Sequence, residues 1–194
     1  MPPRVRYSKD AILNAALEVV REGGMEALNA RVLAVRLGCS TQPIYRELRG
    51  MEALREGVLA RAAQMFSQCV QSAPAPGMPP YKATGMALLR FAHEEPQLYR
   101  LLFLRDRGSE GALLEEPRMS DATAHVYETI MQATGYTLDT ARRFHTHMFI
   151  YIQGMAAMIA TGYAPYDEAQ NGALLSEAFA ALRRLFDANG TPSP

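Results

Sequence analysis

Hydrophobic positions recur with helical spacing along most of this chain. After Ser8, for example, Ile12, Ala16 and Val20 fall on one side of a helix, and a pair of glycines then ends the pattern. The strict alternation that marks a half-buried strand is not sustained in any segment. The pattern therefore predicts an all-α protein with about nine helices, at residues 8–22, 30–37, 41–46, 51–72, 81–94, 97–105, 118–134, 138–161 and 166–188.

A proline-rich stretch at residues 74–80 divides this pattern. Its sequence, Pro-Ala-Pro-Gly-Met-Pro-Pro, cannot form regular structure and is the clearest linker in the chain. We therefore expect an N-terminal three-helix domain at residues 1–50, a long connecting helix at about 51–72, and a second helical domain at 73–194. No internal repeat is visible.

Residues 30–46 predict two short helices joined by a tight turn. Asn29 suits the N-cap of the first helix, and Ser40 suits that of the second. Gly38 follows the last apolar position, where a left-handed residue is expected and glycine adopts it without steric cost. Pro43 falls in the first turn of the second helix, where proline is tolerated. This is the layout of a helix-turn-helix, which places its second helix in the major groove of DNA; an ordinary αα-hairpin is the alternative.

The outward side chains of the second helix are suited to contact DNA. Glutamine can read an adenine edge, threonine and proline can contact a thymine methyl group, and tyrosine or arginine can bind phosphates. The candidates are Thr41, Gln42, Pro43, Tyr45 and Arg46. Ile44 is expected to anchor the helix to the core instead.

The charge distribution agrees with DNA contact at one end of the chain. The net charge is zero, which argues against a protein that coats nucleic acid in general. Residues 1–64, however, carry ten basic and seven acidic side chains, whereas residues 65–194 carry ten basic and thirteen acidic ones. A basic N-terminal third on a mildly acidic body fits a localised DNA-binding surface.

Other classes of protein find little support in the sequence. Two well-separated cysteines, Cys39 and Cys69, do not make a disulfide scaffold, so we expect a reducing, cytoplasmic compartment. No apolar run reaches transmembrane length, and the first residues lack the apolar core of a signal peptide. Phosphate-binding loops, nucleophile motifs and metal-ligand spacings are missing, so we expect no enzyme activity, no cofactor, no metal site and no membrane partner.

The N-terminal pattern resembles the tetracycline-repressor-like (TetR) family of transcriptional regulators. The matching stretches are Ile12–Leu17 with the glycine pair at 23–24, Leu28–Ala34 and Leu37–Tyr45, within roughly residues 8–60. Phe91–Phe103 also looks like a segment common in the second domain of these regulators. The resemblance implies a homodimeric repressor. Each subunit would offer its second short helix to one half of a palindromic operator, and a small ligand in the second domain would spread the two heads apart.

The resemblance also implies roles for single residues. Arg31, Thr41, Tyr45 and Arg46 would contact DNA, and Gln42 and Pro43 would face bases. Two departures stand beside these matches. Where the family often has His-Phe, this chain has Glu47-Leu48, and where a phosphate-binding lysine is common it has Met51; Arg49 or Arg46 would then supply the missing charge. These departures motivate an alternative, a small-molecule sensing or sequestering module of the same fold without operator binding.

The second domain offers candidates for a ligand pocket and a dimer interface. Adaptable methionines and aromatic residues suit an apolar ligand, with His93 and His147 as polar handles, although such residues also fill ordinary cores. The pocket candidates are Phe91, Phe103, Tyr127, Met131, Phe144, Met148 and Tyr151. The last two helices are apolar enough to pair with their copies in a four-helix interface, unless both belong to the core of a monomer. The interface candidates are Gly154, Met155, Met158, Phe179, Leu182 and Phe186.

Overall fold

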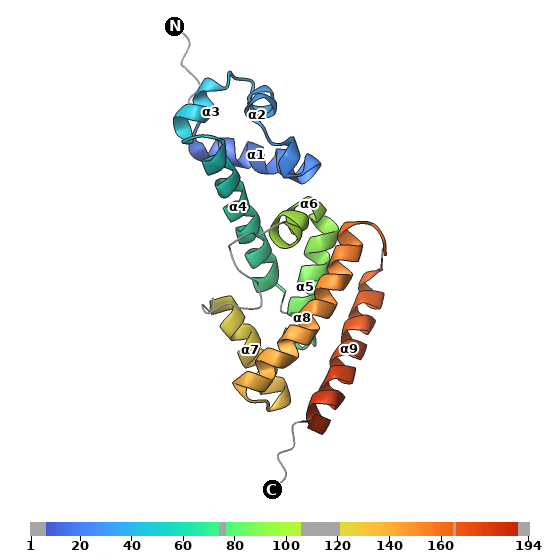
Figure 1. Cartoon of the computed structure of the whole chain (residues 1–194). Coiled ribbons are helices and arrows are strands. Elements are labelled where there is room, and N and C mark those ends of the chain that lie inside the picture. Colours follow the sequence, from blue (N-terminus) through green and yellow to red (C-terminus); the bar gives the residue numbers. More distant parts are fainter. Residues whose placement is uncertain (1–6, 74–76, 106–120, 165, 190–194) are drawn as a thin grey trace. The chain divides into compact units, whose positions relative to one another are not determined.

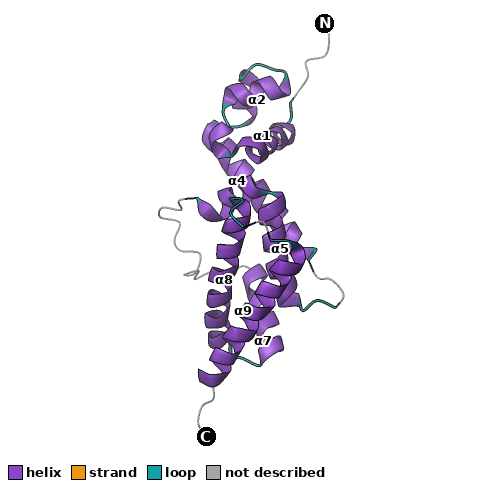
Figure 2. Ribbon diagram, turned by 90° about the vertical axis from the view of Figure 1, so that its right-hand side faces the viewer, coloured by secondary structure: helices purple, strands orange, loops and turns teal. Residues whose placement is uncertain are grey.

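The computed structural model describes residues 7–73, 77–105, 121–164 and 166–189, and this part of the chain is helical without any strand (Figures 1 and 2). The predicted all-α class is thereby confirmed. The chain forms two compact units. The first contains the residues up to Gln68 together with Glu94–Arg105, and the second contains Cys69–His93 and the residues after Arg105. The predicted helix and loop residues at 106–120 lie outside the described part.

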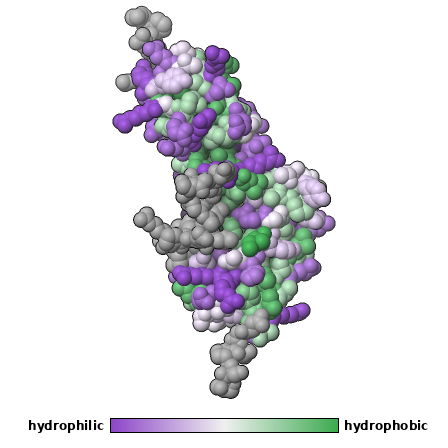
Figure 3. All heavy atoms as spheres, viewed as in Figure 1, coloured by the Kyte–Doolittle hydropathy of each residue, from purple (hydrophilic) through white to green (hydrophobic). Residues whose placement is uncertain are grey.

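The first unit is built from short helices around a small apolar core. Its elements are α1 (Lys9–Gly23), the 3₁₀ turn η1 (Met25–Ala27), α2 (Ala30–Leu37), α3 (Gln42–Glu47), most of α4 (Met51–Gln71), α6 (Pro96–Tyr99) and the π-helical turn η2 (Arg100–Leu104). Ile12, Val20, Leu33, Ile44 and Leu54 are fully or almost fully buried between them. On the face shown in Figure 3, hydrophilic side chains are interspersed with apolar ones over the N-terminal helices.

Local capping decides where these helices begin and end. Asn29 Oδ1 accepts hydrogen bonds from the backbone N–H groups of Arg31 and Val32, at 3.1 and 3.0 Å. Gly38 closes α2 in the left-handed conformation, with φ 67° and ψ 34°. Both features are as predicted. The expected role of Ser40 is wrong, because α3 starts one residue later, with Thr41 as its N-cap and no capping side-chain bond.

The second unit contains α5 (Pro80–Glu94) except its last residue, α7 (Asp121–Thr134), α8 (Leu138–Ala160), α9 (Glu168–Asn189) and the end of α4. Thr137 caps α8 by accepting a hydrogen bond from the N–H group of Thr140 at 3.3 Å, as expected. The long helix α8 packs against both α7 and α9 (Figure 1). Phe144 is fully buried between them and makes edge-to-face contacts with Phe179 and Phe186, at centroid distances of 5.2 and 5.4 Å.

One predicted helix has a different form. The sequence pattern suggests a single helix over 97–105, whereas the chain forms one α-helical turn from Pro96 and then the π-helical turn η2. Phe103 in this turn packs against Phe66 and Tyr99, with ring centroids 5.1 and 5.2 Å away. A π turn shifts the register of the side chains, and this shift is a feature that sequence periodicity does not encode.

Candidate DNA-binding helix and ligand cavity

The pair α2 and α3 has the geometry of a helix-turn-helix. After α2, the N–H groups of Gly38 and Cys39 return to the carbonyl groups of Val35 and Ala34, at 3.1 and 3.0 Å. The turn therefore satisfies two of the last carbonyl groups of the helix, and the Tyr7 hydroxyl group donates to a third, that of Leu37, at 2.9 Å. On the other side of the turn, Ile44 holds α3 against the core. An anchored helix with one free face is what groove recognition requires.

The predicted DNA contacts lie at the surface of the first unit. Arg31, Gln42, Arg46 and Arg49 are exposed, and the side chain of Tyr45 is 52% exposed. Thr41 and Pro43 are partly buried. All the side chains named for DNA binding thus have some accessible surface, whereas Leu48, one of the departures from the family pattern, is buried as a core residue. Their contact with DNA stays a prediction.

The charges next to α3 are partly neutralised. The Arg46 guanidinium donates from Nε to Glu47 Oε1 at 3.0 Å. Arg36 on α2 pairs with Glu22 of α1, and the hydrogen bond to this guanidinium lowers the pKa of the Glu22 carboxyl group. No ion pair to Arg31 or Arg49 is formed within the described part of the chain. The guanidinium charges of Arg31 and Arg49 are thus not neutralised by an ion pair there, as the predicted contact with a phosphate backbone requires.

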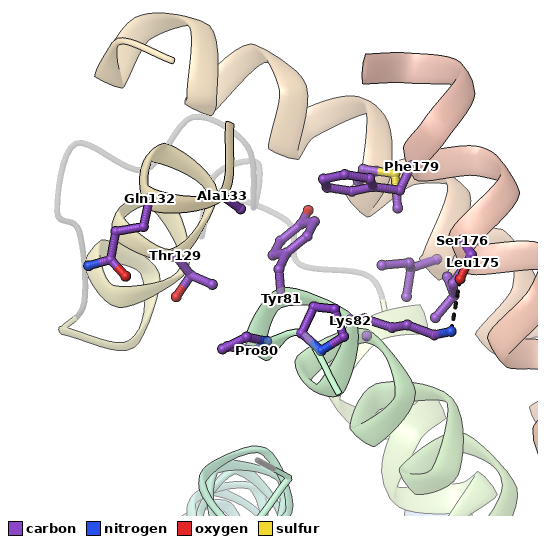
Figure 4. Close-up of a pocket in the computed structure, with 13 residues that line it drawn as sticks. Pro80, Tyr81, Lys82, Thr129, Gln132, Ala133, Leu175, Ser176 and Phe179 are labelled. Atoms are coloured by element: carbon purple, nitrogen blue, oxygen red, sulfur yellow. Dashed lines mark hydrogen bonds between the residues drawn. The ribbon is translucent and has the colours of Figure 1, made fainter. Parts of the chain in front are cut away.

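The second unit contains a cavity of about 350 Å³ between α5, α7, α8 and α9 (Figure 4). Most of its lining is apolar. The lining residues are Pro79, Pro80, Tyr81, Lys82, Gly85, Thr129, Gln132, Ala133, Met148, Ile152, Leu175, Ser176 and Phe179. This volume is within the range of small-molecule sites, in which a few polar groups orient a mainly apolar ligand.

One lining residue of the cavity, Tyr81, is paired with His145, which lies behind it and outside the lining. Tyr81 Oη and His145 Nδ1 lie 2.9 Å apart and share a hydrogen bond. Burial lowers the pKa of His145 to about 4, so the imidazole is neutral at pH 7. Burial also raises the pKa of the Tyr81 hydroxyl group well above its usual value, so this group is neutral as well.

A second polar group is the Lys82 ammonium, which is held on α9. Lys82 Nζ donates to Ser176 Oγ at 2.8 Å, and Ser176 Oγ in turn donates to the Gly172 carbonyl group at 2.9 Å (Figure 4). The end of the lysine side chain also passes close to Gly172, where a Cβ atom would lie 3.5 Å from Nζ. These contacts fix the position of a positive charge at the edge of the cavity, where it borders a shallow hollow that Gly172 and Ser176 also line.

The residues predicted for the ligand pocket are not brought together. Met148 lines the cavity, but the other six do not. Phe91 and Phe144 are core residues, Phe103 belongs to the first unit, and Tyr151 is exposed. Tyr127 instead stacks edge to face on His145, with the ring centroids 5.6 Å apart, and Met131 is partly buried. The suggested polar handles, His93 and His147, are exposed and outside the lining.

The residues predicted for the dimer interface have different environments. Gly154 is exposed, while Met158, Phe179 and Leu182 are partly buried. Met155 and Phe186 are buried within the protomer, which leaves them little surface for a second chain. Large apolar side chains that α8 and α9 do expose include Ile150 at 59% and Leu185 at 52%. The predicted interface included neither residue, because sequence periodicity does not say which neighbouring helix covers each face.

The described residues also bear on metal binding and on membrane insertion. No group of three or more histidine, cysteine, aspartate or glutamate residues in this part could hold a metal ion. Among the helices searched there, none combines the length and the apolar character that crossing a membrane requires.

Comparison with known proteins identifies the fold. No protein-family model matches the sequence, and no curated protein does. Solved structures do match. A TetR-like transcriptional regulator from Rhodococcus sp. RHA1 has a TM-score of 0.61 at 17% identity over 98% of this chain and 100% of the other. A putative TetR-family regulator from Vibrio parahaemolyticus has a TM-score of 0.59 at 21% identity, over 89% and 96% of the two chains. A multidrug binding protein complexed with imidazole has a TM-score of 0.54 at 20% identity, over 92% and 97%.

Proposed function

We propose that this chain, which has the fold of the TetR-like transcriptional regulators, is a sequence-specific DNA-binding regulator. In this proposal it is a homodimeric repressor that binds a palindromic operator and is released by a small, mainly apolar molecule. The observation that carries the proposal is the anchored helix α3. Ile44 is buried beneath it, and Gln42, Tyr45 and Arg46 are exposed on it.

The cavity of the second unit supports the regulatory part of the proposal. It has the size and the mainly apolar lining of a small-molecule site. A fold that combines a helix-turn-helix with such a cavity is suited to couple ligand binding to DNA binding through a differential affinity of the ligand for two states.

Exposed apolar side chains support the homodimer. Ile150 and Tyr151 on α8 and Leu185 on α9 are substantially exposed, although they belong to apolar helices. A second copy of the same chain would remove these side chains from water. A two-fold dimer would also match the two halves of a palindromic site.

The test is selection of double-stranded DNA from a random-sequence library by the full chain, followed by fluorescence anisotropy on the enriched sequence. We expect an inverted repeat and an affinity that falls steeply with salt concentration, because phosphate contacts release counterions. Tyr45→Ala and Arg46→Ala should each weaken binding about tenfold, as expected for loss of one phosphate or base contact. Arg90→Ala, an exposed arginine of α5 in the second unit, is the matched control and should not change the affinity.

Failure to enrich any sequence would favour the second candidate, a small-molecule sensing or sequestering module of the same fold. The pairing of Arg46 with Glu47 supports this alternative, because it reduces the positive charge beside α3. Unchanged affinity in both α3 variants would refute the assigned DNA-binding face.

A further inference from the structure

We propose that the cavity of the second unit binds a small amphipathic carboxylic acid, with the carboxylate paired to Lys82 and the apolar body enclosed by α5, α8 and α9. The inference rests on the proposed function in one respect, that this acid would be the small molecule that releases the protein from DNA. Binding of the acid itself depends only on the cavity.

The charge of the cavity wall favours an anion. Among the described residues that line the cavity, Lys82 is the only charged one, and the other polar side chains, such as Tyr81, Thr129 and Gln132, are neutral. The described lining therefore has no carboxylate that would attract an amine or neutralise Lys82. The first turn of α5, which contains Lys82, has no acidic residue either.

Lys82 is also placed so that it has donors left for a ligand. An ammonium group has three N–H donors, and one of them is directed to Ser176 Oγ. Glu168 lines a neighbouring shallow hollow that shares Lys82 and Ser176 with the cavity. No ion pair joins Lys82 to Glu168 within the described residues, so a carboxylate of the ligand would meet a charge that another carboxylate does not already bind.

The rest of the cavity selects the other end of the ligand. Met148, Ile152, Leu175 and Phe179 provide an apolar wall from α8 and α9, and the prolines before and at the start of α5 close another side. Transfer of an alkyl or aromatic group from water into this cavity contributes to the affinity but does not orient the ligand. The ion pair with Lys82 provides the orientation. The expected class is thus an acid with one carboxylate and a compact apolar body, and not a sugar, a polyphosphate or an amine.

Calorimetric titration of the full chain with decanoate, decan-1-ol and decylamine tests the proposal, because the three probes share one alkyl body. We expect decanoate to bind about tenfold more tightly than decan-1-ol, and decylamine to bind most weakly, as a charge-assisted hydrogen bond predicts. Lys82→Met should reduce the affinity for decanoate to that for the alcohol, and Lys82→Arg should retain the preference. Equal affinities for acid and alcohol, or a preserved preference in Lys82→Met, would overturn the proposal.

The sequence provides a matched control, since Lys9 and Lys82 are the two lysines among 20 basic residues. Lys9→Met changes the same charge in the first unit and should leave decanoate binding unaltered. Acetylation of the wild-type protein followed by mass spectrometry gives a readout that needs no variant: decanoate should protect Lys82 and not Lys9. Equal acetylation of Lys82 with and without decanoate would refute the contact even if Lys82→Met failed to fold.

These titrations contain no DNA, so the two proposals can fail separately. A chain that binds decanoate through Lys82 but selects no DNA sequence would refute the proposed regulator and retain the acid site. A chain that selects an inverted repeat but shows no preference for decanoate would support the proposed regulator and refute the acid site.

Discussion

Arg21 of α1 and Glu95, the residue that precedes α6, form a two-pronged ion pair in the first unit. Arg21 Nε donates to Glu95 Oε2 at 2.8 Å, and Nη2 donates to the other carboxylate oxygen. The glutamate side chain is only 14% exposed and the arginine 37%. The same guanidinium also bonds to Glu18, at 2.9 Å, but the side chain of Glu18 is 48% exposed. Glu95 thus connects residues that are 74 positions apart in the sequence.

We expect Glu95→Gln to lower the free energy of unfolding by about 1 kcal/mol, because a bidentate and partly buried pair exceeds the usual contribution of a surface ion pair. Glu18→Gln is the matched control and should lower it by less than about 0.5 kcal/mol, since an exposed pair within one helix contributes little. Urea denaturation followed by circular dichroism measures both values. Equal effects of the two substitutions would show that the ion pair with Glu95 contributes no more to the free energy of unfolding than an exposed pair does.

A second prediction concerns the carboxylate beside the DNA-binding helix. Glu47 accepts a hydrogen bond from Arg46 and places a negative charge next to the face that would meet phosphates. Glu47→Gln should therefore strengthen binding to double-stranded DNA about threefold to tenfold and steepen the dependence of log K on log salt by about one. Fluorescence anisotropy over a series of salt concentrations measures both quantities.

Glu128→Gln is the control for this substitution, because Glu128 is an exposed carboxylate of α7 in the second unit. It changes the net charge of the protein equally but should leave the salt dependence unaltered. If the two variants raise the affinity by the same factor, the effect of Glu47 is one of net charge and does not depend on its place beside Arg46.

Local signals explain why the helices could be predicted from the sequence. Asn29, Gly38 and Thr137 each determine a helix end through bonds within a few residues, so a pattern of capping residues and glycines locates that end. Ser40 misled the prediction because two neighbouring hydroxyl residues, Ser40 and Thr41, are both suited to a cap, and neither makes a capping side-chain bond.

The cavity could not be predicted in the same way, because its lining comes from four helices far apart in the sequence. Periodicity shows that Phe144 and Phe91 point inward, but it does not show that other side chains fill the space around them. One feature of the sequence does distinguish Lys82 as a candidate binding residue. It is one of two lysines in a chain that otherwise uses arginine, and it lies beside Tyr81 directly after the proline-rich linker.

The buried imidazole of His145 predicts a dependence of stability on pH. Its pKa is lowered to about 4 in the folded chain, mainly by burial, against 6.5 for an unperturbed histidine. The unfolded chain therefore binds the proton more readily than the folded chain. The contribution of His145 to the free energy of unfolding is fully present above about pH 6.5 and is lost as the pH falls towards 4. The loss attributable to this group is at most about 3 kcal/mol, from 1.36 kcal/mol for each pKa unit.

His145→Gln should remove this part of the acid sensitivity while keeping an acceptor for the Tyr81 hydroxyl group. Urea denaturation gives the free energy of unfolding of each protein at pH 7 and at pH 4.5. The loss between the two pH values should be smaller in the variant than in the wild type. His125→Gln replaces an exposed histidine of α7, whose long and exposed pair with Glu128 at 3.9 Å contributes little, so it should hardly alter the loss. A variant as acid-sensitive as the wild type would mean that the imidazole of His145 is solvated in the folded state.

The last prediction tests the proposed dimer at Gly154, in the middle of α8. A Cβ atom added there would meet nothing within 4 Å in the protomer, and the residue is exposed. Because alanine is favoured over glycine inside a helix by about 1 kcal/mol, Gly154→Ala should stabilise the isolated protomer. In the proposed dimer, however, glycine permits close approach of a second α8. Sedimentation equilibrium should then show dimer dissociation constants about tenfold higher in the variant, since overpacking of a tight contact costs at least about 1 kcal/mol. A stabilised chain whose dimer is not weakened would place Gly154 outside the interface and leave Ile150 and Leu185 as the apolar contacts to be tested.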